Sequence, residues 1–228
     1  MYRRKENINS SGYGIIREMV EEMKREIIEF TTEEAWLAHR GHDLTSSDIP
    51  ILFNVGYGTY ENLFQAKLNH TQNPFTPNER VAWGVALESA IAEKFAKDNG
   101  WNIRKKPEYI RIKELRLGSS FDYEIQSEDE DDKGEAHSVR EILEIKTVDA
   151  WEFKQKWLTG FEIQATPYIE LQVQHQLLVS GLETTYIGVL IGGNEGKILK
   201  RTANKKIQDA ILAKAKEFWR RIDEARKQ

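Results

Sequence analysis

The sequence contains no cysteine. This absence excludes disulfides, iron-sulfur clusters and thiolate zinc sites, and it leaves oxygen-ligated cations such as Mg²⁺, with Mn²⁺ able to replace it, as the available metal chemistry. The chain also lacks a run of about 18 apolar residues, and no apolar segment follows the basic residues at its start, so neither a membrane span nor a secretory signal is predicted. We therefore expect a soluble cytoplasmic protein without a membrane partner.

The net charge of −4 is concentrated in one place. Residues 128–132 carry five carboxylates in a row, and outside them the positive and negative charges nearly balance. A local basic groove matters more for nucleic-acid binding than the total charge, so this balance neither supports nor excludes DNA. With 228 residues, 39% of them hydrophobic, the chain can bury one sizeable core, and we predict a single domain over residues 1–228.

Apolar residues at three-to-four spacing and capping residues predict helices in the first hundred residues. The predicted helices are residues 13–30 within a helical extension over 1–30, a helix capped by Thr31 with Glu34, a short helix from Ser47 and Asp48 to Leu52, a helix from Thr59 to Leu68, and a helix from Thr76 to Gly100.

After Gly100 the pattern changes to the alternation typical of strands. The elements expected there are short strands from Trp101 to Ile125, a polar acidic loop over 126–140, a strand over 141–148, helices over 151–158 and 167–181, a strand over 185–191 and a C-terminal helix over 203–228. This order predicts an α/β or α+β fold in which helices flank a central sheet.

Glu144 and Lys146 lie two residues apart on the strand predicted over 141–148, so both side chains leave the same face. Asp122 lies on the preceding strand, with Glu124 as a possible outer neighbour. Carboxylates on adjacent strands can hold Mg²⁺, and a lysine beside them can orient or deprotonate the attacking water. The alternative is a simple charge pair on a sheet surface, because Glu-x-Lys is short enough to occur by chance.

The wider order of motifs resembles the lambda exonuclease (YqaJ-like) branch of the viral recombination nucleases, whose core carries the PD-(D/E)xK signature. The motifs, in chain order, are Trp36-x-x-x-Arg40 with Thr45-Ser46-Ser47-Asp48, then Trp83-Gly84-Val85-Ala86-Leu87-Glu88, Ser120-Phe121-Asp122, Glu144-Ile145-Lys146, and Tyr168 with Gln172-Val173-Gln174-His175-Gln176. The resemblance covers roughly residues 31–192, and it implies a restriction-endonuclease-like core with a central mixed sheet.

The resemblance also implies roles for individual residues. Asp122, Glu144 and Glu88, with the backbone carbonyl of Ile145, would be the metal ligands, and Lys146 the catalytic lysine. Gln172 would line the same site beside Tyr168. The residues that would bind the terminal 5′-phosphate and the DNA are Arg40, Ser47, Ser120 and, near the point of strand separation, Val81.

Several of these positions have a simpler interpretation. Glu88 could be a solvated helix residue, Gln172 a surface amide, and Arg40 a side chain packed at the edge of the core. Trp36 and Trp83 are expected to be packing residues. His39 and His42 have a spacing found in zinc sites, but without companion ligands we interpret them as surface residues.

The function implied by the resemblance is a Mg²⁺-dependent 5′-to-3′ exonuclease that degrades one strand of linear double-stranded DNA in recombination by single-strand annealing. It would act on DNA ends in a bacterial host cell, as a homotrimer ring with a single-strand annealing protein as partner. Two alternatives stay open: an endonuclease of repair or restriction type, and a catalytically inactive DNA-binding scaffold subunit.

Overall fold

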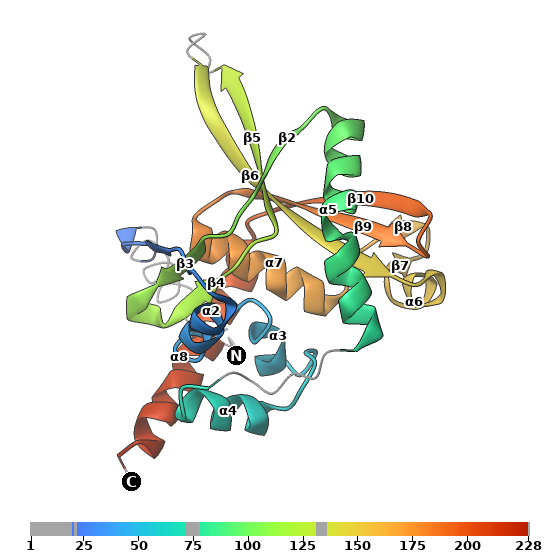
Figure 1. The fold of residues 1–228 in the computed structure, drawn as a ribbon. Helices are drawn as coiled ribbons and strands as arrows, with labels where there is room; N and C mark the ends of the chain where they lie inside the picture. The colour runs from blue at the N-terminus through green and yellow to red at the C-terminus, as the bar shows by residue number, and fades with distance from the viewer. Residues whose placement is uncertain (1–19, 21, 72–77, 131–135, 228) are drawn as a thin grey trace, which may run out of the picture.

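A five-stranded mixed sheet forms the centre of the computed structural model, which describes residue 20 and residues 22–71, 78–130 and 136–227. The strand order is β10-β9-β6-β5-β2 (Figure 1). Only the β6–β9 pairing is parallel, and its neighbours are antiparallel. The strands are β2 Asn102–Lys105, β5 Tyr123–Glu130, β6 Ala136–Val148, β9 Thr184–Ile191 and β10 Glu195–Thr202.

Two helices cover opposite faces of this sheet. Helix α5 (Glu79–Asn99) packs Ile91 and Phe95 against Leu143 and Ile145 on one face. Helix α7 (Pro167–Ser180) lies on the other face, where Ile169 and Val173 pack against residues of β9. Because side chains alternate along β6, Glu144 and Lys146 point away from the α5 face and toward α7.

A smaller three-stranded sheet of order β1-β3-β4 stands beside the central one with the remaining helices (Figure 1). Leu44, Ile49, Leu117 and Phe218 belong to the apolar core that joins these elements to α7. The elements are β1 Glu26–Ile28, β3 Tyr109–Ile112, a 3-10 turn Lys113–Leu115, β4 Leu117–Ser119, α2 Glu33–Arg40, α3 Ile49–Leu52, α4 Tyr60–Leu68 and α8 Lys205–Ala225.

A short connecting segment joins β6 to α7 at the far end of the sheet. It consists of α6 (Ala150–Lys156) and the hairpin of β7 (Leu158–Thr159) and β8 (Glu162–Ile163). The segment from β6 through α7 to β9 connects two parallel neighbours, as a crossover helix must. The fold class predicted from the sequence is confirmed: a central mixed sheet is flanked by helices.

The prediction of a helix over residues 13–30 holds at the described residues 20 and 22, which are helical, and is wrong toward its C-terminal end. Residues 26–28, expected to end a helix, form strand β1, which pairs with Tyr109 to Arg111 of β3. Two consecutive isoleucines, Ile27 and Ile28, occur as readily in an edge strand as at the end of an amphipathic helix, so the apolar pattern did not separate the two. The rest of the predicted extension over 1–30 lies largely outside the described residues.

Two helix starts differ from the prediction, and a third helix starts where predicted but without the side-chain cap. Thr32, not Thr31, caps α2, with its hydroxyl accepting from the Ala35 amide at 3.2 Å. Asn78 caps α5, because its side chain accepts from Val81, while the predicted start at Thr76 lies outside the described residues. Asp48 occupies the N-terminal position of α3 without capping it. The predicted helix start at Thr59 and the predicted helix ends at Gly100 and Gly181 are confirmed, and all three residues are caps.

The segment predicted as an acidic loop over 126–140 is mostly strand. Residues Gln126 to Glu130 of β5 pair with Ala136 to Arg140 of β6, and the hairpin projects from the body of the molecule (Figure 1). Alternating polar residues on a two-sided exposed ribbon give no apolar signal, so the sequence pattern resembled a loop. The helix expected to reach Leu158 ends at Lys156, and β10 was not predicted. No helix in the described part of the chain is long and apolar enough to cross a membrane.

Candidate active site

Asp122 and Glu144 meet where β5 and β6 run side by side. Tyr123 pairs with Leu143, so the register continues to place Asp122 opposite Glu144, with both side chains on the α7 face. The backbone amide of Ile145 donates to Oδ2 of Asp122 at 2.8 Å, which fixes this carboxylate at the end of the strand. The two carboxylates predicted from the sequence are therefore brought together.

Glu144 is held by three donors. Its side chain is only 2% exposed, and the Lys146 ammonium and the Gln172 amide both donate to Oε1 at 2.5 Å. Gln176, one helical turn after Gln172 on α7, donates to Oε2 at 2.7 Å. Each oxygen of a buried anion thus has a partner, which a charge in this position requires.

The electrostatics of the site favour added positive charge. Burial and the neighbouring Glu144 carboxylate raise the pKa of Asp122 to about 7, against the opposing effect of Lys146. Burial alone would lower the pKa of Lys146, but the two carboxylates raise it above its ordinary value. Lys146 therefore stays an ammonium here and compensates part of the carboxylate charge. Two crowded carboxylates that share one cation are a suitable environment for a divalent metal ion.

Glu88 lies near Asp122, since its charge contributes to the raised pKa of Asp122. In this arrangement Glu88 binds Lys105 of β2 at 2.5 Å instead of joining the other two carboxylates. Within the described residues, no three acidic, histidine or cysteine side chains are grouped as a ready metal site. The third predicted ligand is therefore adjacent to the site but engaged elsewhere.

The carbonyl of Ile145 is placed by strand geometry. In a strand, the N–H and C=O of one residue point to the same side, and the N–H of Ile145 points to Asp122. This orientation fits the predicted role of the carbonyl as a further ligand. Tyr168, in the first turn of α7, packs edge-on against Tyr57 with ring centroids 4.9 Å apart, and the charge of Lys146 acts on its hydroxyl.

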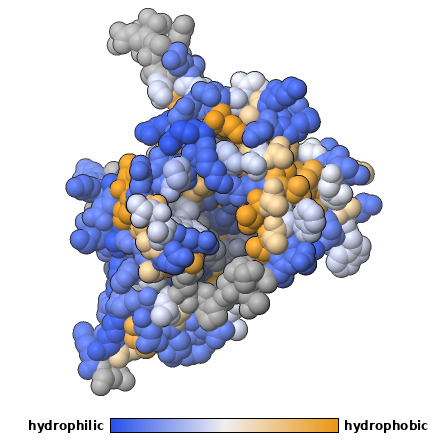
Figure 2. All heavy atoms as spheres, viewed as in Figure 1, coloured by the Kyte–Doolittle hydropathy of each residue, from blue (hydrophilic) through white to orange (hydrophobic). Residues whose placement is uncertain are grey.

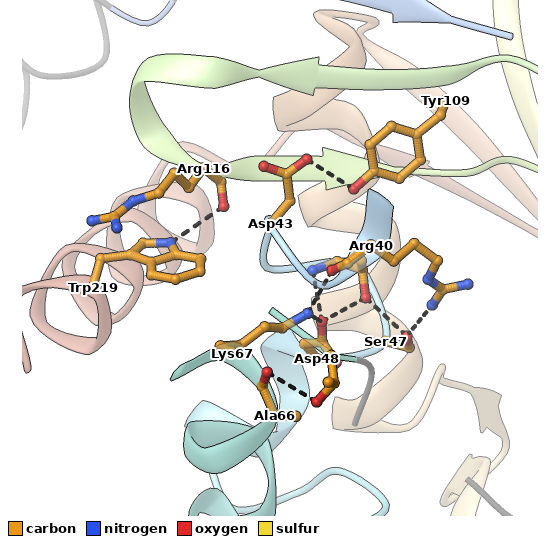
Figure 3. Close-up of polar contacts among 11 residues, drawn as sticks. Arg40, Asp43, Ser47, Asp48, Ala66, Lys67, Tyr109, Arg116 and Trp219 are labelled. Atoms are coloured by element: carbon orange, nitrogen blue, oxygen red, sulfur yellow. Dashed lines mark hydrogen bonds and ion pairs between the residues drawn. The ribbon is translucent and has the colours of Figure 1, made fainter. Parts of the chain in front are cut away.

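A second group of side chains gathers Arg40, Ser47 and Ser120, as the sequence predicts. The Arg40 guanidinium donates to the hydroxyl of Ser47 at 3.0 Å and lies 4.5 Å over the ring of Trp36. The indole N–H of Trp36 in turn donates to the hydroxyl of Ser120 at 2.9 Å. Figure 3 shows Arg40 and Ser47 turned toward one another. Trp36 is thus a linking residue, more than the packing residue that the sequence suggested.

Gln176 connects the two groups. Besides Glu144, its amide donates to the backbone carbonyl of Ser120, at a longer 3.4 Å. Ser120 precedes Asp122 by two residues, so one short segment serves both the carboxylate pair and the Arg40 group. Sequence reasoning gave Gln176 no role, although its spacing of four from Gln172 places both on one helix face.

Val81 lies in the first turn of α5, two turns before Glu88, and is partly exposed. Further along this helix, Trp83 and Val85 are 62% and 70% exposed, and Leu87 is exposed as well. Figure 2 shows apolar atoms gathered over α5, on one side of a hollow in this face of the molecule. Trp83 is therefore a surface residue, and the predicted packing role is wrong.

Three other predicted residues lie apart from the carboxylate pair. Glu124 binds Lys106 at 3.1 Å and Arg104 at 3.4 Å, which gives it a different set of partners from Asp122. His39 packs against Phe30 and Tyr109 and is only partly exposed, so the expected surface position is wrong. His42 is exposed as predicted, with its ring centroid 4.4 Å from that of His70.

Known structures share this architecture. An alkaline exonuclease from Laribacter hongkongensis, LHK-Exo, superposes with a TM-score of 0.64 at 16% sequence identity, over 84% of this chain and 93% of that one. LHK-Exo in complex with dAMP gives a TM-score of 0.66 at the same identity and coverage. At this identity the likeness establishes the fold. No curated protein matches the chain in sequence.

The sequence also matches a described family, the YqaJ-like viral recombinase domain, over residues 35–183. The match begins in the helix that carries Arg40 and ends just after the helix that carries Gln172, so it includes both groups of site residues. Since it extends over more than half of the sequence, we conclude that the chain belongs to the family of YqaJ-like viral recombinase domains.

Proposed function

We propose that the protein is a Mg²⁺-dependent exonuclease that degrades one strand of linear double-stranded DNA from its 5′ end. The observation that carries the proposal is the pair of the partly buried Asp122 and the buried Glu144, with Lys146 beside them. Membership in the viral recombinase family and the fold shared with an alkaline exonuclease support it. Phosphodiester hydrolysis needs charge stabilisation and an activated water, and a bound divalent metal supplies both.

Asp122, Glu144 and the Ile145 carbonyl would hold Mg²⁺, or Mn²⁺ in its place, through hard oxygen ligands. Glu88 would complete the set after releasing Lys105, whose side chain is 62% exposed. An ion pair with so exposed a partner is weak, so a divalent cation can displace it. Gln172 and Gln176 would keep Glu144 in place through their amide donors.

Lys146 would position the attacking water and assist its deprotonation. Its ammonium now binds Glu144, and added positive charge at the carboxylates would weaken that attachment. The side chain is 23% exposed, so it can reach a substrate that enters from the surface.

Arg40, Ser47 and Ser120 would bind the terminal 5′-phosphate, with Val81 near the point where the strands separate. A guanidinium can bind a phosphate through two parallel charge-assisted hydrogen bonds, and the hydroxyls complete the pocket. A terminal phosphomonoester carries more charge than a phosphate within the chain. The pocket should therefore favour phosphorylated ends by about 1.5–3 kcal/mol, or roughly ten- to a hundredfold.

By family analogy the enzyme would act as a homotrimer ring around DNA and pass the 3′ overhang to a single-strand annealing protein, in the cytoplasm of a bacterial host. Residues 1–228 would form one nuclease domain. Sedimentation of the purified protein tests the trimer, for which a monomer at micromolar concentration would be a contradiction.

The decisive assay compares linear duplex with closed circular duplex, in Mg²⁺ and in EDTA. We expect mononucleotide release from the linear substrate alone, and only with metal. Cleavage of the closed circle would instead identify an endonuclease. No cleavage of either substrate would identify an inactive DNA-binding subunit.

Three isosteric variants test the site: Asp122→Asn, Glu144→Gln and Lys146→Met. Each should reduce degradation by at least about a hundredfold, because each removes a metal ligand or the water-orienting charge. Asp122→Asn also relieves crowding between carboxylates, so its melting temperature should equal or exceed that of the wild type. Asp98→Asn, in an exposed ion pair at the end of α5, is the matched control. Near-normal activity in any of the three would disprove the assigned site.

Arg40→Met tests the phosphate pocket, because methionine keeps a long side chain over Trp36 but removes the charge. We expect it to slow digestion of 5′-phosphorylated duplex about ten- to a hundredfold and digestion of 5′-hydroxyl duplex little. Equal losses on both substrates would show that Arg40 serves only to pack the loop.

A further inference from the structure

The loop between α2 and α3 follows Arg40, the last residue of α2, and carries Ser47 near its end. A site that recognises a phosphate must hold such groups within about 0.5 Å, so the loop needs anchors. One anchor is Asp43, which is fully buried and accepts from Arg111 at 2.7 Å and from Tyr109 at 3.2 Å. This contact fastens the middle of the loop to β3 and leaves its two ends to be fixed by other groups.

Lys67 of α4 reaches both ends of the loop at once (Figure 3). Its ammonium donates to the backbone carbonyl of Arg40 at 2.8 Å and pairs with Oδ2 of Asp48 at 2.8 Å. The same Asp48 oxygen accepts from the amide of Thr45 at 2.9 Å and from its hydroxyl at 2.8 Å. The Thr45 hydroxyl lies 3.1 Å from that of Ser47, which accepts from Arg40.

The two charges are almost fully buried. The side chain of Lys67 is 2% exposed and that of Asp48 is 8% exposed. Burial alone would raise the pKa of Asp48, but Lys67 and the hydrogen bonds to the carboxylate lower it. A buried ion pair stabilises a fold no better than well-packed apolar residues do, so stability alone does not explain charges here. What the pair adds is directional contacts to both ends of one loop.

We infer that Lys67 and Asp48 form a clamp that positions Arg40 and Ser47 for the terminal phosphate. Both are positioning residues: they act through the loop and do not touch the phosphate. This inference rests on the proposed function, because it assigns a purpose to the same pocket. It extends that function to a residue of α4, an element that the resemblance to known nucleases gave no role.

The test is the double variant Lys67→Met with Asp48→Asn, which removes both charges and keeps the volumes. The asparagine oxygen still accepts from Thr45, but the tether to the Arg40 carbonyl is lost. We expect kcat/KM on 5′-phosphorylated duplex to fall about ten- to a hundredfold, because misplacing binding groups by 1 Å costs that much. On 5′-hydroxyl duplex it should change less than about twofold. The ratio between the two substrates is a readout that a general loss of stability does not move.

Asp223→Asn is the matched control, since it weakens the bidentate contact between Asp223 of α8 and Arg116, which precedes β4. It should leave the substrate ratio unchanged. If the double variant does not fold, Asp48→Asn alone decides, with a loss of at least about threefold expected in the ratio. A wild-type preference that survives in the folded variant overturns the clamp but not the pocket. A wild type without any preference overturns both, whereas metal-dependent degradation tests the proposed nuclease separately.

Discussion

His175 gives the structure a specific sensitivity to acid. The residue lies on α7 between Gln172 and Gln176, is fully buried, and neither ring nitrogen has a hydrogen-bond partner in the described structure. Burial lowers the pKa of His175 to about 3, and the charge of Asp48 offsets only part of this effect. The imidazole of His175 is therefore neutral in the folded protein at any pH well above 3.

The size of this loss of stability follows from the pKa of His175 in the unfolded and in the folded chain. In the unfolded chain the histidine takes up a proton near pH 6.5, whereas the folded chain resists until about pH 3. His175 thus leaves the free energy of unfolding unchanged above about pH 6.5 and lowers it as the pH falls from 6.5 toward 3. Each pH unit in that window costs about 1.4 kcal/mol, so at pH 4.5 the loss is about 2.7 kcal/mol.

His175→Leu removes the titrating group and fills the site with an apolar side chain of similar size. Urea unfolding of both proteins at about pH 7.5 and pH 4.5 gives four free energies of unfolding. The decrease between the two pH values should be smaller by about 2.7 kcal/mol in the variant. Other titrating groups are common to both proteins and cancel in this comparison. An equal decrease in the two proteins would refute the buried neutral imidazole.

Mg²⁺ binding should weaken by up to about tenfold for each pH unit below pH 7, because the cation must displace the proton that Asp122 retains through its raised pKa. Calorimetric titration measures this, and a pH-independent affinity would contradict it. Gln176→Leu should reduce activity about tenfold, since Glu144 loses a donor. The control Gln208→Leu replaces a buried glutamine of α8 and should leave the rate unchanged, and equal rates in the two variants would remove Gln176 from the site. Replacing residues 127–139 by Asn-Gly should preserve the melting temperature and keep the rate within about twofold, and insoluble protein would show that the hairpin is structural.

The sequence located the carboxylate pair because strands carry a simple signal. Branched residues around Glu144 and Lys146 identified the strand, and alternation placed both charges on one face. Helix ends were predictable at Gly100 and Gly181, because glycine readily adopts the left-handed backbone that ends a helix. Such signals are confined to a few neighbouring residues.

The clamp was invisible for the opposite reason. Lys67 meets Asp48 and the Arg40 carbonyl only after the chain has folded, and a lysine on a helix usually faces solvent. Strand β10 was missed because its alternating charged residues resemble a loop on the edge of a sheet. Asp48 was predicted to be a helix cap, because aspartate is common at helix starts and the local sequence does not show its ion pair with Lys67.

The free edges of the β5–β6 hairpin bear on how copies of the protein behave toward one another. In the pairings of the described strands, β2 accompanies β5 only as far as Gln126, and β9 joins β6 only from Ile142. The outer part of the hairpin therefore exposes backbone donors and acceptors that another strand could pair with, the usual route to aggregation. The acidic run over 128–132 begins within β5, so like charges come together whenever two such edges approach. The acidic run thus protects solubility, and neutralising it should yield folded protein that precipitates on standing.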